Sequence, residues 1–134
     1  MTFLLNALLR SRDIMRDGDL YLRRYYLLRT RLVSVFIHYI ARSDEDPFLH
    51  CHPWDFIAVL LSGSYVEEGT TGHRRIWPFI PRFRRAEHLH RLHLARPIWT
   101  LFIHFRRRRV WGFMTENGFV EHMKYFEQRE KEQS

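Results

Sequence analysis

The chain has 134 residues, of which 46% are hydrophobic and 16% are aromatic. This content exceeds that of a disordered, solvated segment, and we expect one globular domain over residues 1–134. A single cysteine excludes an internal disulfide framework and is compatible with a reducing, cytoplasmic location. The apolar first nine residues lack a charged start and a small-residue cleavage site, so neither a signal peptide nor a membrane span is indicated.

The basic charge of the chain comes almost entirely from arginine. The formal net charge is +7, and only Lys124 and Lys131 are lysines. Arginine suits bidentate contact with carboxylate or phosphate, although a nucleotide-composition bias of the genome explains the same content. An anionic small-molecule substrate is expected because Arg91 flanks His90 and further arginines lie in the Arg82–Arg85 loop. Nucleic-acid binding by Arg106–Arg109 is a weaker hypothesis, because like charges at a predicted turn usually form a solvated loop and no nucleic-acid motif accompanies them.

Residues 1–16 are predicted to form a short N-terminal helix. Apolar side chains dominate the first nine residues and charged ones follow, a pattern typical of a helix with one broad apolar face. The helix is expected to dock outside the domain or in the contact of a homodimer. Asp17, Gly18 and Asp19 then give a turn signal.

From residue 20 the pattern becomes typical of β-structure. Strands are predicted at Tyr21–Leu28, Leu32–Ala41, Phe56–Leu61, Ser64–Glu68, His73–Trp77, His88–Leu94, Ile98–Phe105 and Val110–Met114. The segment Leu32–Ala41 is apolar on both faces, so it is expected to be buried on both. Many short strands separated by turn signals indicate an all-β sandwich or barrel over residues 20–120.

Three segments between and after these strands are predicted to be irregular or helical. Pro78 and Pro81 interrupt regular strand pairing, which predicts a mobile loop over Pro78–Arg85. An Asn-Gly pair at Asn117 signals a hairpin. The charged residues 121–134 are predicted to form a terminal helix or a frayed tail.

The stretch from residue 46 to residue 63, DPFLHCHPWDFIAVLLSG, contains the clearest candidate site. Side chains at i and i+2 of an extended chain leave the same face, so His50 and His52 are expected to point together. Two imidazoles converging from one strand are a common beginning of a metal site. Pro53 interrupts the alternation, and a bulge there would turn Asp55 inward, giving two nitrogens and one oxygen.

A third nitrogen is expected from a distant strand. His88 and His90 share parity with Leu92 and Leu94, so both histidines face the interior if the leucines do. His90 lies closer to the middle of the predicted strand and is the preferred ligand. His88 stays an open alternative, because a register shift would exchange the two.

The H-x-H pattern of His50 and His52, followed by Gly63, resembles the first motif of the cupin superfamily. In the cupin motif the carboxylate ligand stands one or two residues later than Asp55 stands in this sequence. The single histidine of the second cupin motif is matched by His90. Together with two later tryptophan-containing segments, the HxHPWDF stretch is similar to small single-domain cupins of bacteria and their phages.

The resemblance implies a cupin-type double-stranded β-helix, or jelly-roll barrel, that forms a homodimer. It also implies a metal site, here with His50, His52, Asp55 and His90 as ligands. Imidazole and carboxylate suit a divalent transition metal: iron is the leading expectation, with zinc, nickel or manganese as alternatives. The corresponding function is a metal-dependent small-molecule enzyme, such as a non-haem iron dioxygenase.

Three further side chains are predicted to contact the substrate. His38 shares parity with core residues of its strand and can exchange a proton near neutral pH, while Tyr65 and Glu67 extend the face of the metal site. Other functions stay open at this point. They are a non-catalytic ligand-binding cupin, a metal-free isomerase or epimerase, and a phage-encoded factor that sequesters a metabolite or binds a host protein.

Overall fold

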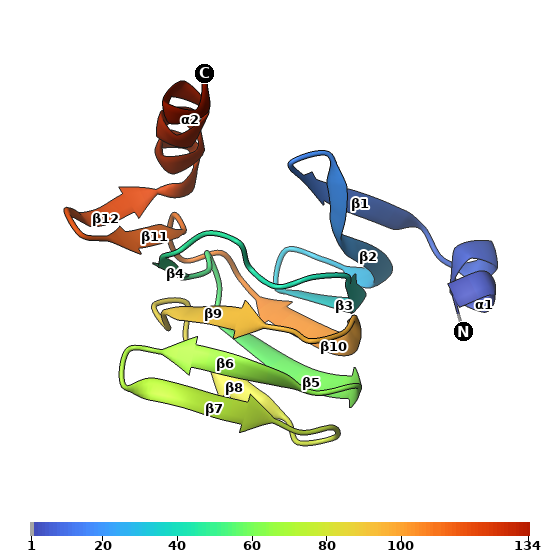
Figure 1. Cartoon of the computed structure of the whole chain (residues 1–134). Coiled ribbons are helices and arrows are strands. Elements are labelled where there is room, and N and C mark those ends of the chain that lie inside the picture. The colour runs from blue at the N-terminus through green and yellow to red at the C-terminus, as the bar shows by residue number, and fades with distance from the viewer. Residues whose placement is uncertain (1) are drawn as a thin grey trace.

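The computed structural model describes residues 2–134, and its strands form two six-stranded antiparallel sheets that lie over one another (Figure 1). Met1, which the predicted N-terminal helix included, lies outside the described residues. The first sheet has the order β1 (Ser11–Arg16), β2 (Asp19–Arg29), β3 (Val33–Ile40), β10 (Ile98–Phe105), β5 (Phe56–Ser62) and β8 (Arg82–Arg84). The second has the order β12 (Gly118–Glu121), β11 (Gly112–Thr115), β4 (Leu49–His50), β9 (His90–His93), β6 (Tyr65–Gly69) and β7 (Gly72–Ile76).

The chain passes back and forth between the two sheets, so most central neighbours are distant in sequence. Strand β10 lies between β3 and β5, and β9 lies between β4 and β6. Sheet alternation turns every second side chain into the space between the sheets. This architecture is the predicted all-β jelly-roll barrel, with one helix near each end of the chain.

Two apolar clusters fill part of the interior. One contains Leu22, Ile40, Leu60, Tyr65, Ile76 and Ile98, and the other contains Phe36, Phe56, Ala58 and Phe102. Strand β3 buries alternate residues and leaves the others half-buried, where Tyr39 packs against Trp99. The prediction that both faces of this segment are fully buried is therefore wrong for the outer face.

The N-terminal helix is shorter than predicted. Helix α1 (Thr2–Leu8) has no buried residue, and the following segment is the strand β1 rather than helix. Asp13 forms an ion pair of 2.6 Å with Arg23 on β2, and the turn is made by Asp17 and Gly18, both with positive φ. The charges that looked like a solvated helix end are the cross-strand partners of an edge strand.

The segment Pro78–Arg85, predicted as a mobile loop, contains strand β8, which pairs with β5. Phe56 and Ala58 are inward residues of β5 and stand opposite Arg84 and Arg82. Both arginines therefore point toward the interior, while Phe83 is exposed. The alternation of this strand was missed because its inward residues are charged.

The charged C-terminal segment forms helix α2 (His122–Gln133), one of the two predicted alternatives. Glu121 caps it by accepting a hydrogen bond of 2.8 Å from the Met123 amide. Tyr125 attaches the helix to the barrel by stacking on Phe113, at 4.0 Å between ring centroids, and by donating to Asp46. No helix formed by residues 2–134 is long and apolar enough to cross a membrane.

Candidate metal centre

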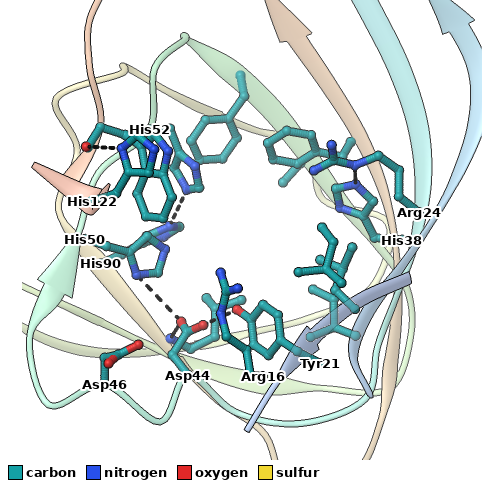
Figure 2. Close-up of a pocket in the computed structure, with 18 of the residues that line it drawn as sticks. Arg16, Tyr21, Arg24, His38, Asp44, Asp46, His50, His52, His90 and His122 are labelled. Carbon is teal, nitrogen blue, oxygen red and sulfur yellow. Dashed lines mark hydrogen bonds and ion pairs between the residues drawn. The ribbon is translucent and has the colours of Figure 1, made fainter. Parts of the chain in front are cut away.

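The space between the two sheets contains a cavity of about 810 Å³. Figure 2 shows His50, His52 and His90 gathered on one wall of it, with His38 and Arg24 on the opposite wall. His50 is on β4 and pairs directly with His90 on β9, while His52 follows β4 by two residues. The sheet register thus brings together histidines that are 40 residues apart in the sequence.

The three imidazoles converge closely enough to share one ion. One ring nitrogen from each of His50, His52 and His90 lies within 4.8 Å of the other two. The Nε2 atoms of His52 and His90 are 2.9 Å apart. Two ligands bound at about 2.1 Å with an angle near 90° are separated by roughly 3 Å, so this spacing matches adjacent positions around a transition metal.

Backbone bonds hold the histidine segment in place after β4 ends. The Cys51 amide donates to the Gly112 carbonyl at 3.0 Å, and the His52 amide donates to the Ala86 carbonyl at 3.1 Å. Cys51, between the two histidines, is buried. His50 and His52 consequently keep the common orientation predicted from their spacing.

The environment favours neutral imidazoles, the form that binds metal. Burial lowers the pKa of His50 to about 4, and burial followed by the charge of His90 lowers the pKa of His52 well below 6.5. Aromatic side chains supply much of this shielding, since His52 stacks on Trp54 and meets Phe56 edge-on at 4.8 Å between ring centroids.

Glu67 determines which nitrogen of His90 faces the other histidines. Its carboxylate lies 2.9 Å from Nδ1 of His90 and 3.0 Å from Nη2 of Arg84. Burial alone would raise the pKa of Glu67, but the adjacent imidazoles of His88 and His90 and the guanidinium of Arg84 outweigh it and lower that pKa. An ionised carboxylate only accepts, so Nδ1 of His90 carries the proton and Nε2 presents its lone pair to His52.

Glu67, predicted to contact substrate, lines the cavity, and its carboxylate is bonded to His90 and Arg84. A carboxylate bonded to the far nitrogen of an imidazole is the usual arrangement that orients a metal-binding histidine. His88 lies beside it, with Nε2 at 3.6 Å from Glu67 and without a hydrogen-bond partner. Of the two candidate histidines, His90 is therefore the one that the structure groups with His50 and His52.

Asp55 does not join the histidines, and its prediction as a metal ligand is corrected. Its Oδ1 accepts from the Ala86 amide at 2.7 Å and from Arg108 at 2.6 Å. Pro53 does not produce the inward bulge that would have turned this side chain, and its carbonyl instead accepts from the Arg108 amide. Asp55 thus anchors the loop of the arginine run to the barrel.

His38 and Tyr65, predicted to contact substrate, both line the cavity. His38 accepts a hydrogen bond of 3.1 Å from Nε of Arg24, and burial, followed by the charge of Arg24, lowers the pKa of His38 well below 6.5. Burial also raises the pKa of Tyr65, whose hydroxyl accepts from Arg82. Near neutral pH the first is a neutral imidazole and the second a neutral phenol.

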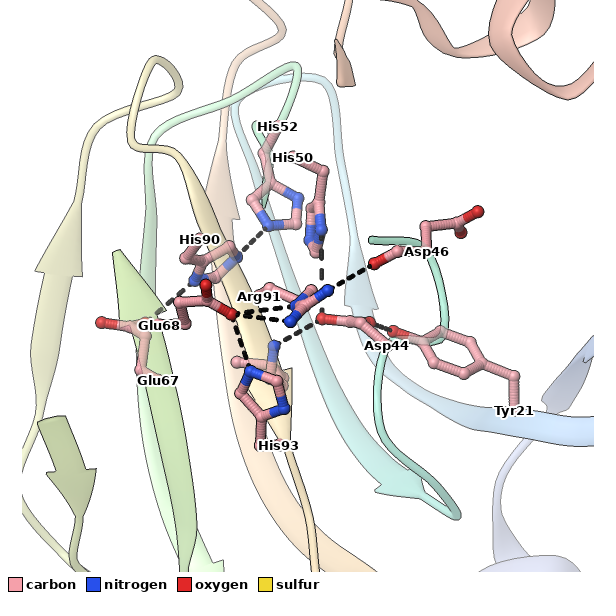
Figure 3. A network of polar contacts seen from close by, with 11 residues as sticks. Tyr21, Asp44, Asp46, His50, His52, Glu67, Glu68, His90, Arg91 and His93 are labelled. Carbon is pink, nitrogen blue, oxygen red and sulfur yellow. Dashed lines mark hydrogen bonds and ion pairs between the residues drawn. The ribbon is translucent and has the colours of Figure 1, made fainter. Parts of the chain in front are cut away.

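Asp44 is one of the residues near the site that sequence reasoning missed. Its Oδ2 lies 3.9 Å from Nδ1 of His50 and accepts from the Leu92 amide at 2.7 Å, while Oδ1 accepts from Tyr21 (Figure 3). Asp44 thereby connects the acidic loop before β4 to β9. The available signal was the acidic stretch directly before the H-x-H pattern.

Another group of side chains with the geometry to hold a metal ion lies on the outside of the barrel. Glu68, His73 and His93 come from three adjacent strands and also have ligand atoms within 4.8 Å of one another. Glu68 already accepts from His93 at 2.8 Å and from Arg91 at 3.0 Å (Figure 3). The arginine neutralises the carboxylate, which weakens this group as a cation site and makes it a useful control.

The pKa of His50 predicts how the stability of the metal-free protein depends on pH. The unfolded chain binds a proton near pH 6.5 and the folded chain only near pH 4, so the free energy of unfolding falls as pH falls through this interval. The expected loss for His50 alone is about 3 kcal/mol. Urea denaturation of chelator-treated protein at several pH values measures it. The free energy of unfolding of a His50→Gln variant should depend less steeply on pH. An equally steep dependence would contradict the lowered pKa of His50 in the folded chain.

No protein-family model matches the sequence, and no curated protein matches it. Solved structures resemble its fold. A cupin-2 domain protein of Rhodospirillum rubrum superposes with a TM-score of 0.65 and 10% identity, over 82% of this chain and 78% of that one. The FeII form of HppE gives a TM-score of 0.61 and 13% identity, over 74% of this chain and 57% of HppE.

A cupin-superfamily sugar phosphate isomerase of Silicibacter pomeroyi gives a TM-score of 0.53 and 14% identity, over 75% of this chain and 74% of that one. The chain spans less than two thirds of the length of HppE. At such identities the similarity concerns the fold alone. The strand order of the two facing sheets and the structural neighbours support the same conclusion. This chain has the cupin fold, a double-stranded β-helix.

Proposed function

We propose that the chain is a metal-dependent small-molecule protein in which His50, His52 and His90 hold one divalent transition metal. The observation that carries this proposal is the 2.9 Å approach of the His52 and His90 Nε2 atoms, with the other nitrogen of His90 bonded to Glu67. The cavity of about 810 Å³ lies within the usual range of small-molecule sites.

The donor set narrows the choice of metal. Three neutral imidazoles suit zinc, iron, nickel or copper, whereas manganese favours oxygen donors, so manganese becomes the least favoured of the expected metals. When bound, such a metal supplies a Lewis acid that polarises a substrate oxygen or, if it is iron, a centre for oxygen chemistry. A dioxygenase-like activity belongs to this proposal and rests on the iron(II) form of one fold neighbour.

The side chains of this protein have separable tasks in the proposed site. Phe56 and Trp54 pack against His52 and exclude water from one side of the histidines. Glu67 keeps the proton of His90 on Nδ1, which leaves Nε2 free as a ligand. His38, on the far wall, is neutral and already accepts from Arg24, so it can position a substrate but is a poor proton donor at neutral pH.

Glu67→Gln tests the orienting role. The amide keeps the size of the side chain but loses its charge, so we expect zinc affinity to fall by about 10–100-fold while one equivalent still binds. Calorimetric titration of chelator-treated protein with zinc measures this effect. Glu68→Gln is the matched control on the outer face of the same strand and should leave the cavity site unchanged. Equal affinity of wild type and Glu67→Gln would contradict the role.

A metal-free function is the second candidate, and one observation favours it. In the absence of an ion, His52 can donate from Nε2 to the lone pair of His90, so the pair is internally satisfied at 2.9 Å. Such a cavity would bind a ligand or support proton transfer in an isomerase or epimerase. Wild-type protein that binds no zinc, iron, nickel or copper in calorimetric titration would favour this candidate over the first.

A further inference from the structure

Arg82 is a cation without a counter-ion inside the barrel. It lines the cavity, and its Nε and Nη1 atoms are buried without a hydrogen-bond partner. Within residues 2–134, its only side-chain hydrogen-bond acceptor is the hydroxyl of Tyr65, and no carboxylate forms an ion pair with it. Burial raises the pKa of Tyr65, so this acceptor is a neutral phenol.

The neighbouring Arg84, unlike Arg82, has a carboxylate counter-ion. Arg84 lies two residues away on the same face of β8 and forms an ion pair of 3.0 Å with Glu67. Tyr65 and Glu67 are likewise two residues apart on one face of β6. Two neighbouring contacts thus join the two sheets. In one, Arg84 meets the carboxylate of Glu67, and in the other Arg82 meets the phenol of Tyr65.

A buried guanidinium with unpaired donors is costly unless something supplies the missing acceptor. We propose that a ligand of the cavity supplies it: Arg82, together with the Tyr65 hydroxyl, forms a subsite for an oxyanion, either a carboxylate or a phosphate group. Arginine is well suited to both groups.

The position of this subsite indicates which class of substrate the cavity would accept. Residues two apart along a strand are separated by about 7 Å, so Arg82 lies roughly that far from the contact of Arg84 with Glu67, which adjoins His90. A small anionic molecule would thus place its charged group at Arg82 and a second polar group near the histidines. This last step rests on the proposed function, whereas binding of the anion itself does not.

The test is titration of chelator-treated, full-length protein with inorganic phosphate and, separately, with acetate, followed by calorimetry and melting temperature. We expect saturable binding of at least one of the two anions by wild type and a loss of at least about 10-fold in affinity for Arg82→Gln, since the variant loses hydrogen bonds between two charged groups. Arg82→Lys should keep most of the binding, because it keeps the charge. Arg75→Gln, an exposed change of the same charge on the outer sheet face, is the control.

Equal anion binding by Arg82→Gln and Arg75→Gln, or no saturable binding by wild type, would overturn the subsite. The two anions identify the group, because a phosphate site and a carboxylate site rank them in opposite order. His90→Ala separates this inference from the metal proposal. If that variant and wild type both bind the anion but neither binds metal, the subsite stands and the metal centre fails. If wild type binds metal but Arg82→Gln binds the anion normally, the metal centre stands and the subsite fails.

Discussion

His90→Ala is expected to lower zinc affinity more than about 100-fold, beyond the loss caused by removing an orienting partner of a ligand. The substitution removes the nitrogen that lies 2.9 Å from His52 Nε2 and frees Glu67 from its imidazole partner. Two imidazoles that remain on one short segment do not supply the three protein ligands usual for a zinc site with an open position. Calorimetry and elemental analysis of dialysed protein measure the loss.

The matched control for this variant is His73→Ala, which removes an exposed imidazole from the group on the outer face. It should leave the tight equivalent of zinc in place. Circular dichroism and urea denaturation establish that both variants fold. A folded His90→Ala protein that keeps wild-type zinc affinity would show that His90 is not a ligand, and loss of zinc in His73→Ala instead would move the site to the outer group.

Gly112→Ala is expected to lower the free energy of unfolding by about 3 kcal/mol. A Cβ atom at this position would overlap the carbonyl oxygen of Val120 and come within 2.9 Å of both Glu121 Cα and the Phe119 ring. Two of these obstacles are backbone atoms of the paired strand β12, which cannot move aside as a flexible side chain does. The strand pair must therefore shift or separate.

The same substitution should disturb the metal centre, because the Gly112 carbonyl accepts from the Cys51 amide between the two histidines of the H-x-H pattern. Gly69→Ala is the control, since a Cβ atom there meets its nearest neighbours at 3.9 Å, an ordinary contact. We expect a change within about 0.5 kcal/mol for that variant. Urea denaturation of both measures the difference, and equal stability of the two would contradict the close approach at Gly112.

The parts of the fold that the sequence predicts well are those whose pattern is local. Strand β10 has the bounds Ile98–Phe105 in both the prediction and the structure, because an apolar and β-branched segment between clear turns carries its own signal. Strands β1 and β8 were missed for the opposite reason. Their charged side chains look solvated in the sequence, and only partners on distant strands, such as Asp13 with Arg23, explain their pairing.

The candidate site likewise has features that the local sequence predicts and features that depend on distant strands. The common orientation of His50 and His52 follows from their spacing and is present in the structure. The error at Asp55 arose because a nearby carboxylate was judged by local geometry, whereas its partner is Arg108, 53 positions further along the chain. Glu67 was chosen as a pocket residue, but its bond to His90 depends on the pairing of β6 with β9, which no local pattern reveals.

The most direct test of the metal centre is an anomalous difference map from crystals of zinc-loaded wild-type protein, collected on both sides of the zinc edge. We expect one strong peak inside the barrel, at about 2.0–2.1 Å from Nε2 of His52 and from Nε2 of His90, for an ion that His50 also binds. A peak confined to Glu68, His73 and His93, or no peak between the histidines of the cavity at saturating zinc, would contradict it.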